Sequence, residues 1–193
     1  MDDLKFHNSV NMNKFESDRI IEFTPPDGAF QLMSYRLTTQ LKPLIWVEVI
    51  SNQLSSTKIE YNVKAKSNYR NKSVAQNVEI SIAVPSDLKN PVFKTAYGNV
   101  SYFPDKEVIN WSINSLPGQT DIYLKFQFNV PTIRIDVSNN YLKRPIQVKF
   151  DIPSFTVSGI QVKYLKISEK SGYQAFPYVK YTTKNGDYHI RLI

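Results

Sequence analysis

Few residues in this chain have the types and spacing that catalysis or metal binding requires. The 193 residues include no cysteine and only two histidines, His7 and His189. The lack of cysteine excludes a thiol nucleophile, a thiolate metal site and a disulfide, and two histidines make a multi-histidine metal site unexpected. One histidine would suffice for a serine-type triad, but no Gly-x-Ser-x-Gly elbow is present. The six glycines form neither a Walker A loop nor a Gly-x-Gly-x-x-Gly pattern. We therefore predict a protein that is not an enzyme and uses no metal or cofactor.

The charge balance is basic, with 24 Lys and Arg against 17 Asp and Glu, which gives a formal net charge of +7. Such a charge suits an anionic partner, such as nucleic acid, an acidic membrane face or an acidic peptide. The basic residues are scattered along the chain, however, and this favours a solvated surface. The aromatic content of 13% would suit stacking on single-stranded nucleic acid. Because most aromatic residues occupy alternating positions typical of a core, we predict no nucleic-acid partner.

Apart from three N-x-Ser/Thr sequons, at Asn71, Asn99 and Asn110, the sequence contains no sign of membrane insertion or secretion. No apolar run approaches the roughly 20 residues that a membrane-spanning helix needs. The acidic start Met1-Asp2-Asp3 is not followed by the apolar segment of a signal peptide. We expect an intracellular, soluble, cytoplasmic protein.

The dominant pattern is an alternation of apolar and polar residues with a period of two. This period predicts strands with one face on a core and the other in water. No segment repeats apolar residues at helical spacing over three turns. The alternation is clear over residues 59–66, 77–84, 122–128 and 146–152. We predict an all-β fold, an antiparallel sandwich or barrel.

Proline and glycine place turns between these strands, because Pro presets φ and Gly accepts a positive φ. The turn signals are Pro25-Pro26-Asp27-Gly28, Pro85-Ser86-Asp87, Pro104-Asp105 and Pro117-Gly118. Asn185-Gly186 separates two strand-like pieces, 181–183 and 188–191, and predicts a tight hairpin.

Two further expectations concern packing and loops. Trp46 and Trp111 both lie in apolar strand-like runs, so we expect both in the core. The polar stretch 136–144 is expected to be a loop, and not a domain boundary, because the strand pattern continues on both sides.

Several longer segments resemble, in order, those of one known family. They are Phe6-His7, Phe15-Glu16-Ser17-Asp18-Arg19, residues 23–36, Lys42-Pro43-Leu44-Ile45-Trp46, residues 158–167 and Asn185-Gly186-Asp187-Tyr188. Together they resemble the mu homology domain of the medium subunits of clathrin adaptor complexes, over essentially the whole chain.

Within this family, two segments resemble the medium subunit of the trans-Golgi and endosomal adaptor. These are Lys42-Pro43-Leu44-Ile45-Trp46 and Glu169-Lys170-Ser171-Gly172-Tyr173-Gln174-Ala175. The plasma-membrane member has a lysine-rich, lipid-binding strand near the position of Gly98. Residues 97–103 lack those lysines here, which argues against the plasma-membrane assignment.

The resemblance implies an elongated, immunoglobulin-like β-sandwich of two subdomains, the second inserted in the first. Residues 1–193 would form one mu homology domain, the C-terminal, cargo-binding part of a medium subunit. The family's N-terminal longin-like domain is expected to be absent, and the first strands of the fold are expected to be missing.

The resemblance also implies a function in vesicle-mediated transport. The family binds the cytosolic tails of transmembrane cargo that carry Tyr-x-x-Φ, where Φ is a bulky apolar residue. The tail lies extended along a sheet edge. The implied partners are these tails, the other subunits of a heterotetrameric adaptor complex and, indirectly, clathrin. The implied location is peripheral, on trans-Golgi, endosomal and coated-vesicle membranes.

The family's peptide-binding residues match five positions near the C-terminus. Val162 and Leu165 match the hydrophobic pocket, with one or both being core residues as the alternative. The family segment Pro-Trp-Val-Arg-Tyr reads Pro-Tyr-Val-Lys-Tyr here, so Tyr178 replaces Trp, Val179 is kept and Lys180 replaces Arg. Arg stacks on an aromatic ring and donates in a planar fork, whereas Lys is a point charge, so weaker tyrosine recognition is expected. An acidic residue that receives the tyrosine hydroxyl in the family lies upstream of the segment that matches Phe6.

A second candidate site is the basic cluster Lys64, Lys66, Arg70 and Lys72, on the outward face of one strand and the loop after it. A similar patch in the resembling subunit is linked to acidic-cluster cargo. A solvated face and phospholipid contact remain as alternatives.

Two other functions stay open. One is a mu homology domain of a different coat or endocytic regulator, with another ligand, which the changes at Tyr178 and Lys180 favour. The other is a truncated structural fragment without cargo binding.

Overall fold

The computed structural model of the protein describes residues 2–38, 42–131, 141, 143–168 and 170–191. Contacts along the chain separate two compact units, Met1–Lys42 and Pro43–Ile193. No helix in the described ranges is long and apolar enough to cross a membrane.

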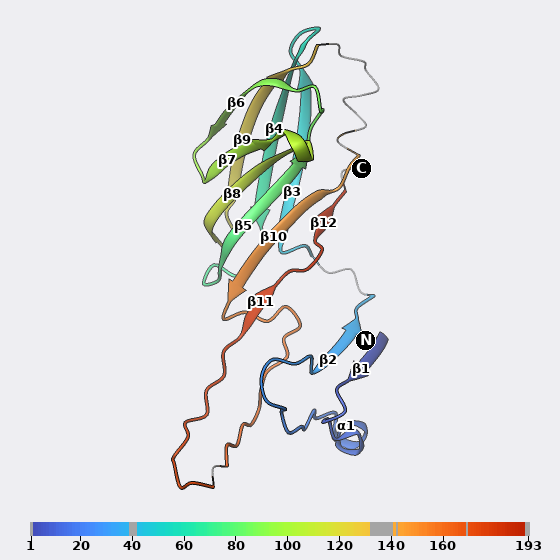
Figure 1. The fold of residues 1–193 in the computed structure, drawn as a ribbon, viewed down its shortest axis with the longest axis vertical. Helices are drawn as coiled ribbons and strands as arrows, with labels where there is room; N and C mark the ends of the chain where they lie inside the picture. Colours follow the sequence, from blue (N-terminus) through green and yellow to red (C-terminus); the bar gives the residue numbers. More distant parts are fainter. Residues whose placement is uncertain (1, 39–41, 132–140, 142, 169, 192–193) are drawn as a thin grey trace. The chain divides into compact units, whose positions relative to one another are not determined.

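The smaller unit combines two strands and one short helix (Figure 1). Its elements are β1 (Asp2–Phe6), α1 (Met12–Asp18) and β2 (Met33–Arg36), and β1 pairs antiparallel with β2. The Asn11 side chain caps the helix by accepting the Lys14 N–H at 3.3 Å, and Arg19 ends it in the left-handed conformation with φ of 57°. The rings of Phe6 and Phe15 meet edge to face, with centroids 4.7 Å apart. A helix of seven residues is too short to show a three-turn apolar stripe in the sequence.

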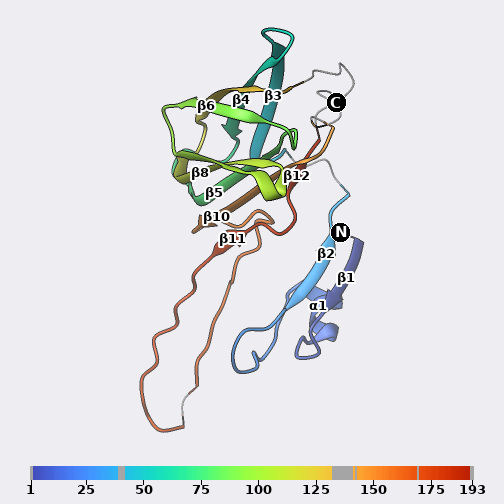
Figure 2. The ribbon, with the colours of Figure 1, turned by 45° about the horizontal axis from the view of Figure 1, so that its top comes forward.

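The larger unit contains a sandwich of two antiparallel sheets, seen as separate layers in Figure 2. The first sheet has the order β3-β4-β9-β6 and the second β11-β10-β5-β8-β7, with β12 also paired to β10. The bounds are β3 (Ile45–Gln53), β4 (Lys58–Ser67), β5 (Val74–Ala83), β6 (Lys89–Thr95), β7 (Asn99–Phe103), β8 (Val108–Pro117), β9 (Asp121–Asn129), β10 (Ile146–Pro153), β11 (Thr182–Lys184) and β12 (His189–Ile190). The all-β prediction is therefore confirmed.

The core fills the space between these two sheets, and the period-two pattern identifies its residues. The four segments predicted as strands coincide with β4, β5, β9 and β10, apart from Val84, which follows the last residue of β5. Each places its alternating apolar residues inward and its polar residues outward. Inward positions exposed by at most 1% include Tyr61, Ile80, Ile82, Leu124, Phe126, Phe128 and Ile152. Burial of these side chains is the main favourable term for the sandwich.

The two tryptophans behave differently. Trp111 is fully buried and its indole N–H donates to the Tyr97 carbonyl at 2.7 Å, so the core expectation is confirmed for it. Trp46 is only half-buried, and its indole N–H donates to the exposed Glu48 carboxylate at 2.9 Å. Trp46 packs against the core only in part, because Ile45 and Val47 point inward on β3 and the residue between them turns to the outer face.

The proline and glycine signals mark real turns. Gly28 has a φ of 81°, and the Leu88 N–H donates to the Pro85 carbonyl at 3.3 Å. Pro104 begins a short 3₁₀ turn before β8, and Pro117-Gly118 leads from β8 to β9. Most of the expected loop at 136–144 lies outside the described residues.

The predicted hairpin at Asn185-Gly186 is wrong. β11 and β12 do not pair with each other, because both pair antiparallel with β10. Lys184 lies opposite Asp151, and His189 lies opposite Gln147. The chain therefore advances five residues from β11 to β12 while β10 advances only four. The Asn-Gly pair therefore forms a bulge in one interrupted edge strand, and does not reverse the chain.

Candidate functional site

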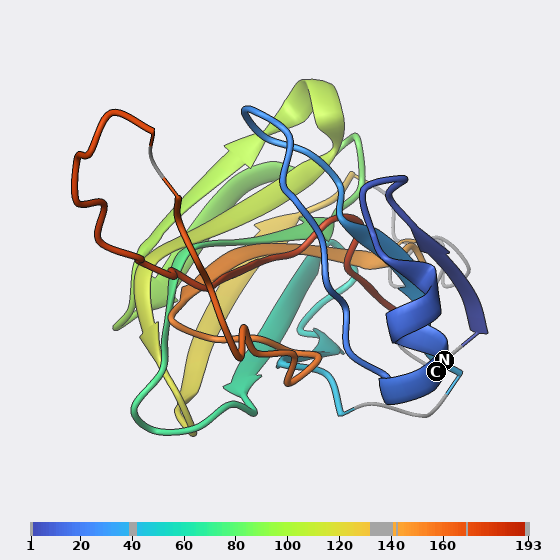
Figure 3. The same ribbon diagram turned by 90° about the horizontal axis from the view of Figure 1, so that it is seen from below.

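A long loop joins β10 to β11 and extends beyond the ends of both strands (Figures 1, 2 and 3). We call residues 155–168 the outgoing limb and residues 172–181 the returning limb. Three hydrogen bonds connect the two sides of the loop near the end of β10 and the start of β11. The Ser154 N–H donates to the Tyr181 carbonyl at 2.9 Å, the Thr183 hydroxyl to the Phe155 carbonyl at 2.7 Å, and the Val162 N–H to the Tyr181 hydroxyl at 2.9 Å.

Beyond these three bonds, the limbs have bare main chain, by which we mean main chain without hydrogen bonds to the described residues. Neither 163–168 nor 173–180 forms a hydrogen bond to any other described residue, and neither forms a strand. An unpaired main chain in this state offers donors and acceptors to an added strand.

The five predicted peptide-binding residues all lie on the limbs. Val162 and Leu165 are on the outgoing limb, with 49% and 37% of their surface exposed. Tyr178 and Val179 are on the returning limb, exposed by 78% and 39%, beside the exposed Lys180. The alternative that Val162 or Leu165 is a core residue does not match this exposure. The Val162–Tyr181 bond brings the two sets of residues to the same part of the loop.

The limbs also carry several exposed apolar side chains that the sequence did not identify as candidate site residues. They are Val157, Tyr164, Ile167, Tyr173 and Phe176, and Phe176 is 82% exposed. The sequence signal was the mixture of apolar residues and lysines through 162–167, which is compatible with an extended segment but says nothing about whether that segment has a partner. The limbs thus present a concentrated apolar surface, of the kind that marks an interaction site.

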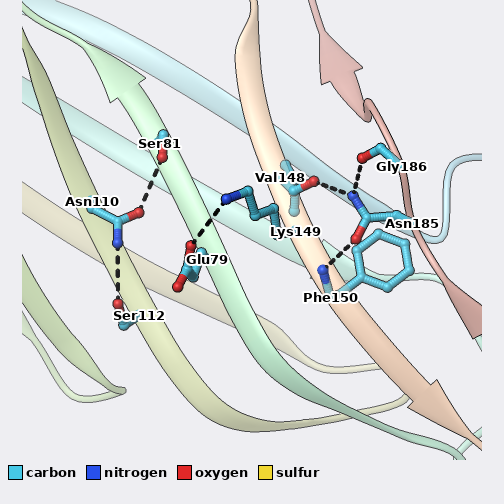
Figure 4. A network of polar contacts seen from close by, with 9 residues as sticks. All are labelled: Glu79, Ser81, Asn110, Ser112, Val148, Lys149, Phe150, Asn185 and Gly186. Carbon is cyan, nitrogen blue, oxygen red and sulfur yellow. Dashed lines mark hydrogen bonds and ion pairs between the residues drawn. The ribbon is translucent and has the colours of Figure 1, made fainter. Parts of the chain in front are cut away.

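The bulge at Asn185 anchors the base of the returning limb on β10 (Figure 4). The Asn185 side-chain amide donates to the Val148 carbonyl at 2.6 Å and accepts the Phe150 N–H at 2.6 Å. It therefore replaces the two main-chain partners that an uninterrupted strand would supply here. The Tyr188 carbonyl restores the regular pairing by accepting the Val148 N–H at 3.0 Å.

The four residues of the basic cluster have different environments. Lys64 and Lys66 lie on β4, and Arg70 and Lys72 follow it in the turn to β5. Lys64 is paired with Asp121 at 2.8 Å, and this hydrogen bond raises the pKa of Lys64 and lowers that of Asp121. The other three side chains are exposed and form no ion pair with the described residues. Positive charge without an ion pair among the described residues is thus concentrated at Lys66, Arg70 and Lys72, although Lys66 lies opposite Asp121 and also lowers the pKa of that carboxyl.

The turn that carries Arg70 and Lys72 is held rigidly against the β8–β9 turn. The Tyr69 hydroxyl donates to the Leu116 carbonyl at 2.7 Å, and the Ser67 hydroxyl donates to the Pro117 carbonyl at 2.7 Å. Gly118 packs so closely that a Cβ there would lie 2.1 Å from the Arg70 carbonyl oxygen. Any larger residue at position 118 would displace this turn.

Comparisons with known proteins agree with the resemblance. The model of the adaptor complexes medium subunit family matches residues 1–192. The chain is 50% identical over 191 residues to the AP-1 complex subunit mu-2 of Mus musculus, and 50% identical over 192 residues to the AP-1 complex subunit mu of Dictyostelium discoideum. These alignments cover 99% of this chain, but only 45% and 44% of those relatives. The chain thus spans less than half the length of these relatives.

Two kinds of solved structure share the fold. A homology model of the full-length AP-3 complex in an intermediate open conformation matches with a TM-score of 0.64 and 16% identity, covering 99% of this chain and 54% of that one. The yeast delta-COP-I mu-homology domain matches with a TM-score of 0.50 and 13% identity, over 78% of this chain and 60% of that one. The same domain has also been solved with a Dsl1 WxWxV peptide. On its sequence and its fold, the chain belongs to the adaptor complexes medium subunit family.

Proposed function

We propose that this chain is a cargo-recognition module that binds Tyr-x-x-Φ signals in the cytosolic tails of membrane proteins. The observation that carries the proposal is the loop between β10 and β11, where bare main chain coincides with exposed apolar side chains. An extended tail added as a strand would satisfy the main chain, while side-chain pockets would select the sequence.

Each of the five limb residues has a separate role in this proposal. Val162, Leu165 and Val179 would cover the apolar Φ side chain, because they are the aliphatic residues of the limbs that match the family pocket. Tyr178 would flank the tail with its ring, and Lys180 would lie beside the signal tyrosine. A Lys at this position attracts the ring less well than Arg, so modest affinity is expected.

The test is a titration of a fluorescent Tyr-x-x-Leu peptide against this chain, followed by fluorescence anisotropy. The same peptide with Tyr→Ala serves as the reference, and a longer protein with the upstream residues of its relatives serves as a second sample. Binding that needs the tyrosine supports the proposal. Binding that ignores Tyr→Ala, or no binding to either protein, would contradict it.

A matched pair of variants tests where the tail binds. Val162→Ser changes an exposed valine of the outgoing limb, and Val92→Ser changes an exposed valine of β6 on the sandwich. Only Val162→Ser should weaken peptide binding, while both should leave the melting temperature nearly unchanged. Equal effects on binding would place the tail elsewhere.

The exposed cations at Lys66, Arg70 and Lys72 support a second candidate function, binding of acidic-cluster cargo. The turn that carries two of them is held by the Tyr69–Leu116 hydrogen bond and by the close packing of Gly118 on the Arg70 main chain, which fixes where these two side chains begin. A peptide of consecutive glutamates should bind with strong salt dependence, because screening weakens charge contacts. Arg70→Gln should reduce this binding more than Lys94→Gln on β6 does. No binding at low salt would remove this function.

The delta-COP neighbour motivates an alternative within the same fold, since that domain was solved with a WxWxV peptide. The replacements at Tyr178 and Lys180 also favour a different ligand. A WxWxV peptide belongs in the same titration, and tighter binding of it than of the tyrosine peptide would favour this alternative. A fragment without cargo binding would instead be indicated by a melt that is not cooperative.

The proposed partners follow from family membership. They are the tails of transmembrane cargo and the other subunits of an adaptor complex, with clathrin reached indirectly. We place the protein on the cytoplasmic face of trans-Golgi, endosomal and coated-vesicle membranes as a peripheral protein. Co-purification of the tagged protein with adaptor large subunits would test this assignment.

A further inference from the structure

The loop between β10 and β11 has a strong charge imbalance. Residues 155–184 contain five lysines and a single acidic residue, Glu169, which lies outside the described residues. Lys184 lies opposite Asp151 across the β10–β11 pair. The other four lysines are exposed and have no ion pair within the described part of the chain; they are Lys163, Lys166, Lys170 and Lys180. Lys170 lies between the two limbs and the other three lie on them; we call all four the limb lysines.

The limb lysines alternate with the apolar side chains of the candidate site. Lys163 and Lys166 enclose Tyr164 and Leu165 on the outgoing limb, and Lys180 follows Val179 on the returning limb. An extended peptide that covers the apolar side chains therefore passes several cations at short intervals. Cations on both limbs would raise the local concentration of an anionic ligand and accelerate its association.

The bare main chain of the limbs favours a peptide over a membrane as the anionic partner. The main-chain N–H and C=O groups of residues 163–168 and 173–180 form no hydrogen bond with the described part of the chain. Hydrocarbon cannot satisfy such groups, and each unsatisfied group costs several kcal/mol there. An extended peptide satisfies them through a strand ladder.

We propose, on the basis of the proposed function, that the limb lysines make the site selective for tails with acidic residues before and within the Tyr-x-x-Φ signal. The tyrosine and Φ residues set the position of the tail, and the acidic residues set its affinity among tails that share the motif. An exposed charge pair contributes about 0.2–1 kcal/mol, so each well-placed acidic residue should tighten binding by about 1.5- to 5-fold at low salt.

The test compares two peptides of equal length, one with Glu and one with Gln at both x positions and at the two residues before the tyrosine. Each peptide is also made with Tyr→Ala. Binding is measured at 50 mM and 500 mM NaCl, about 14 Å and 4 Å in Debye length, so that screening is nearly complete in the second buffer. The protein variants are K163Q/K166Q on the outgoing limb and K89Q/K94Q on β6, which lower the net charge equally.

The Glu peptide should bind at least 5-fold more tightly than the Gln peptide at low salt, and the advantage should shrink at high salt. K163Q/K166Q should remove most of this advantage and K89Q/K94Q should not. Equal binding of the two peptides, or equal effects of the two double variants, would overturn the inference.

The Tyr→Ala peptides separate the two proposals. If binding needs the tyrosine but ignores Glu, the charge selectivity fails while the proposed function stands. If binding follows Glu but ignores the tyrosine, the proposed function fails while the charge selectivity stands. Sedimentation with phosphatidylserine vesicles provides the last comparison. If the wild-type protein pellets with the vesicles, K163Q/K166Q does not, and the Glu peptide binds no more tightly than the Gln peptide, the anionic partner would be a membrane surface and not a peptide.

Discussion

The Tyr188 hydroxyl bonds both main-chain groups of Ile45. It donates to the Ile45 carbonyl oxygen at 2.8 Å and accepts the Ile45 N–H at 3.3 Å. Ile45 begins β3 in the first sheet, whereas Tyr188 immediately precedes β12 in the second. One side chain near the C-terminus thus completes the hydrogen bonding of an edge strand more than a hundred residues earlier. Burial, the largest effect, raises the pKa of Tyr188. A tyrosine with the ordinary pKa of about 10 is already neutral at physiological pH, so this hydroxyl is able to donate.

Removing this hydroxyl with Tyr188→Phe should destabilise the protein. The Ile45 main-chain groups, fully buried, would lose their partner, which costs about 1–3 kcal/mol. Urea denaturation measures the change in the free energy of unfolding. Tyr164→Phe is the control, because Tyr164 is 77% exposed and should change stability by less than about 0.5 kcal/mol. Equal effects of the two substitutions would show that the Tyr188 bonds contribute nothing.

Asn185→Asp should weaken the attachment of the interrupted edge strand to β10. A carboxylate at position 185 would face the Val148 carbonyl oxygen, where the amide now donates. The lost bond and the repulsion should cost about 1–3 kcal/mol at neutral pH. Because the carboxylate is disfavoured in the folded state, its folded pKa would be raised. The loss in the free energy of unfolding relative to wild type should therefore be complete above that folded pKa. It should become smaller as the pH falls, because the protonated acid can donate to the Val148 carbonyl.

Chemical denaturation of wild type and variant at several pH values measures this deficit. Asn114→Asp is the control, since Asn114 is exposed on β8 and its side chain forms no hydrogen bond with the described residues. A deficit for Asn185→Asp that does not change with pH would contradict the role of the amide as donor.

Two buried tyrosines should respond in opposite ways to loss of the hydroxyl. Tyr69 donates to the Leu116 carbonyl at 2.7 Å, so Tyr69→Phe should destabilise by about 1–3 kcal/mol. The buried Tyr61 hydroxyl has no hydrogen-bond partner within the described residues, so Tyr61→Phe should be neutral or stabilising. Thermal unfolding of the two single variants shows whether each substitution lowers or raises the stability. A loss of similar size at both positions would mean that Tyr61 has a partner.

Alkaline pH should unfold the protein through these same two residues. Burial is the largest cause of a pKa raised to about 12 for both Tyr61 and Tyr69, against about 10 in the unfolded chain. Because the folded state favours the neutral phenol, this contribution to stability is complete below pH 10 and is lost as the pH rises through 12. Ultraviolet absorbance of tyrosinate and circular dichroism should therefore change together in this range. If the double variant Tyr61→Phe/Tyr69→Phe loses stability between pH 10 and 12 as steeply as wild type, these two tyrosines are not the cause of the alkaline unfolding.

Lys180→Arg should strengthen binding of a Tyr-x-x-Φ peptide. A guanidinium would stack on the tyrosine ring and donate in a fork, which adds about 1 kcal/mol, or about 5-fold in Kd. Fluorescence anisotropy with the Tyr peptide and its Tyr→Phe version measures the gain. Lys149→Arg on β10 is the control. No gain for Lys180→Arg would show that position 180 does not contact the tyrosine.

Much of the sandwich was predictable because its strands are long and each has one buried face. Alternation in residues 59–66 and 122–128 identifies the inward positions of β4 and β9 without knowledge of their partners. The same rule could have placed Trp46, since an apolar residue between Ile45 and Val47 must face outward. Its size suggested burial, and the geometry of the strand overrode that preference.

The sequence by itself determined the family and the core, because both depend on residues that are neighbours along the chain. It also identified the limb residues through their resemblance to a known motif. Only the tertiary structure decided that Asn185-Gly186 is a bulge, because the deciding contacts come from Val148 and Phe150 on another strand. The same holds for the exposure of Val162, Leu165 and Val179, since the local sequence does not show whether a neighbouring strand covers these residues.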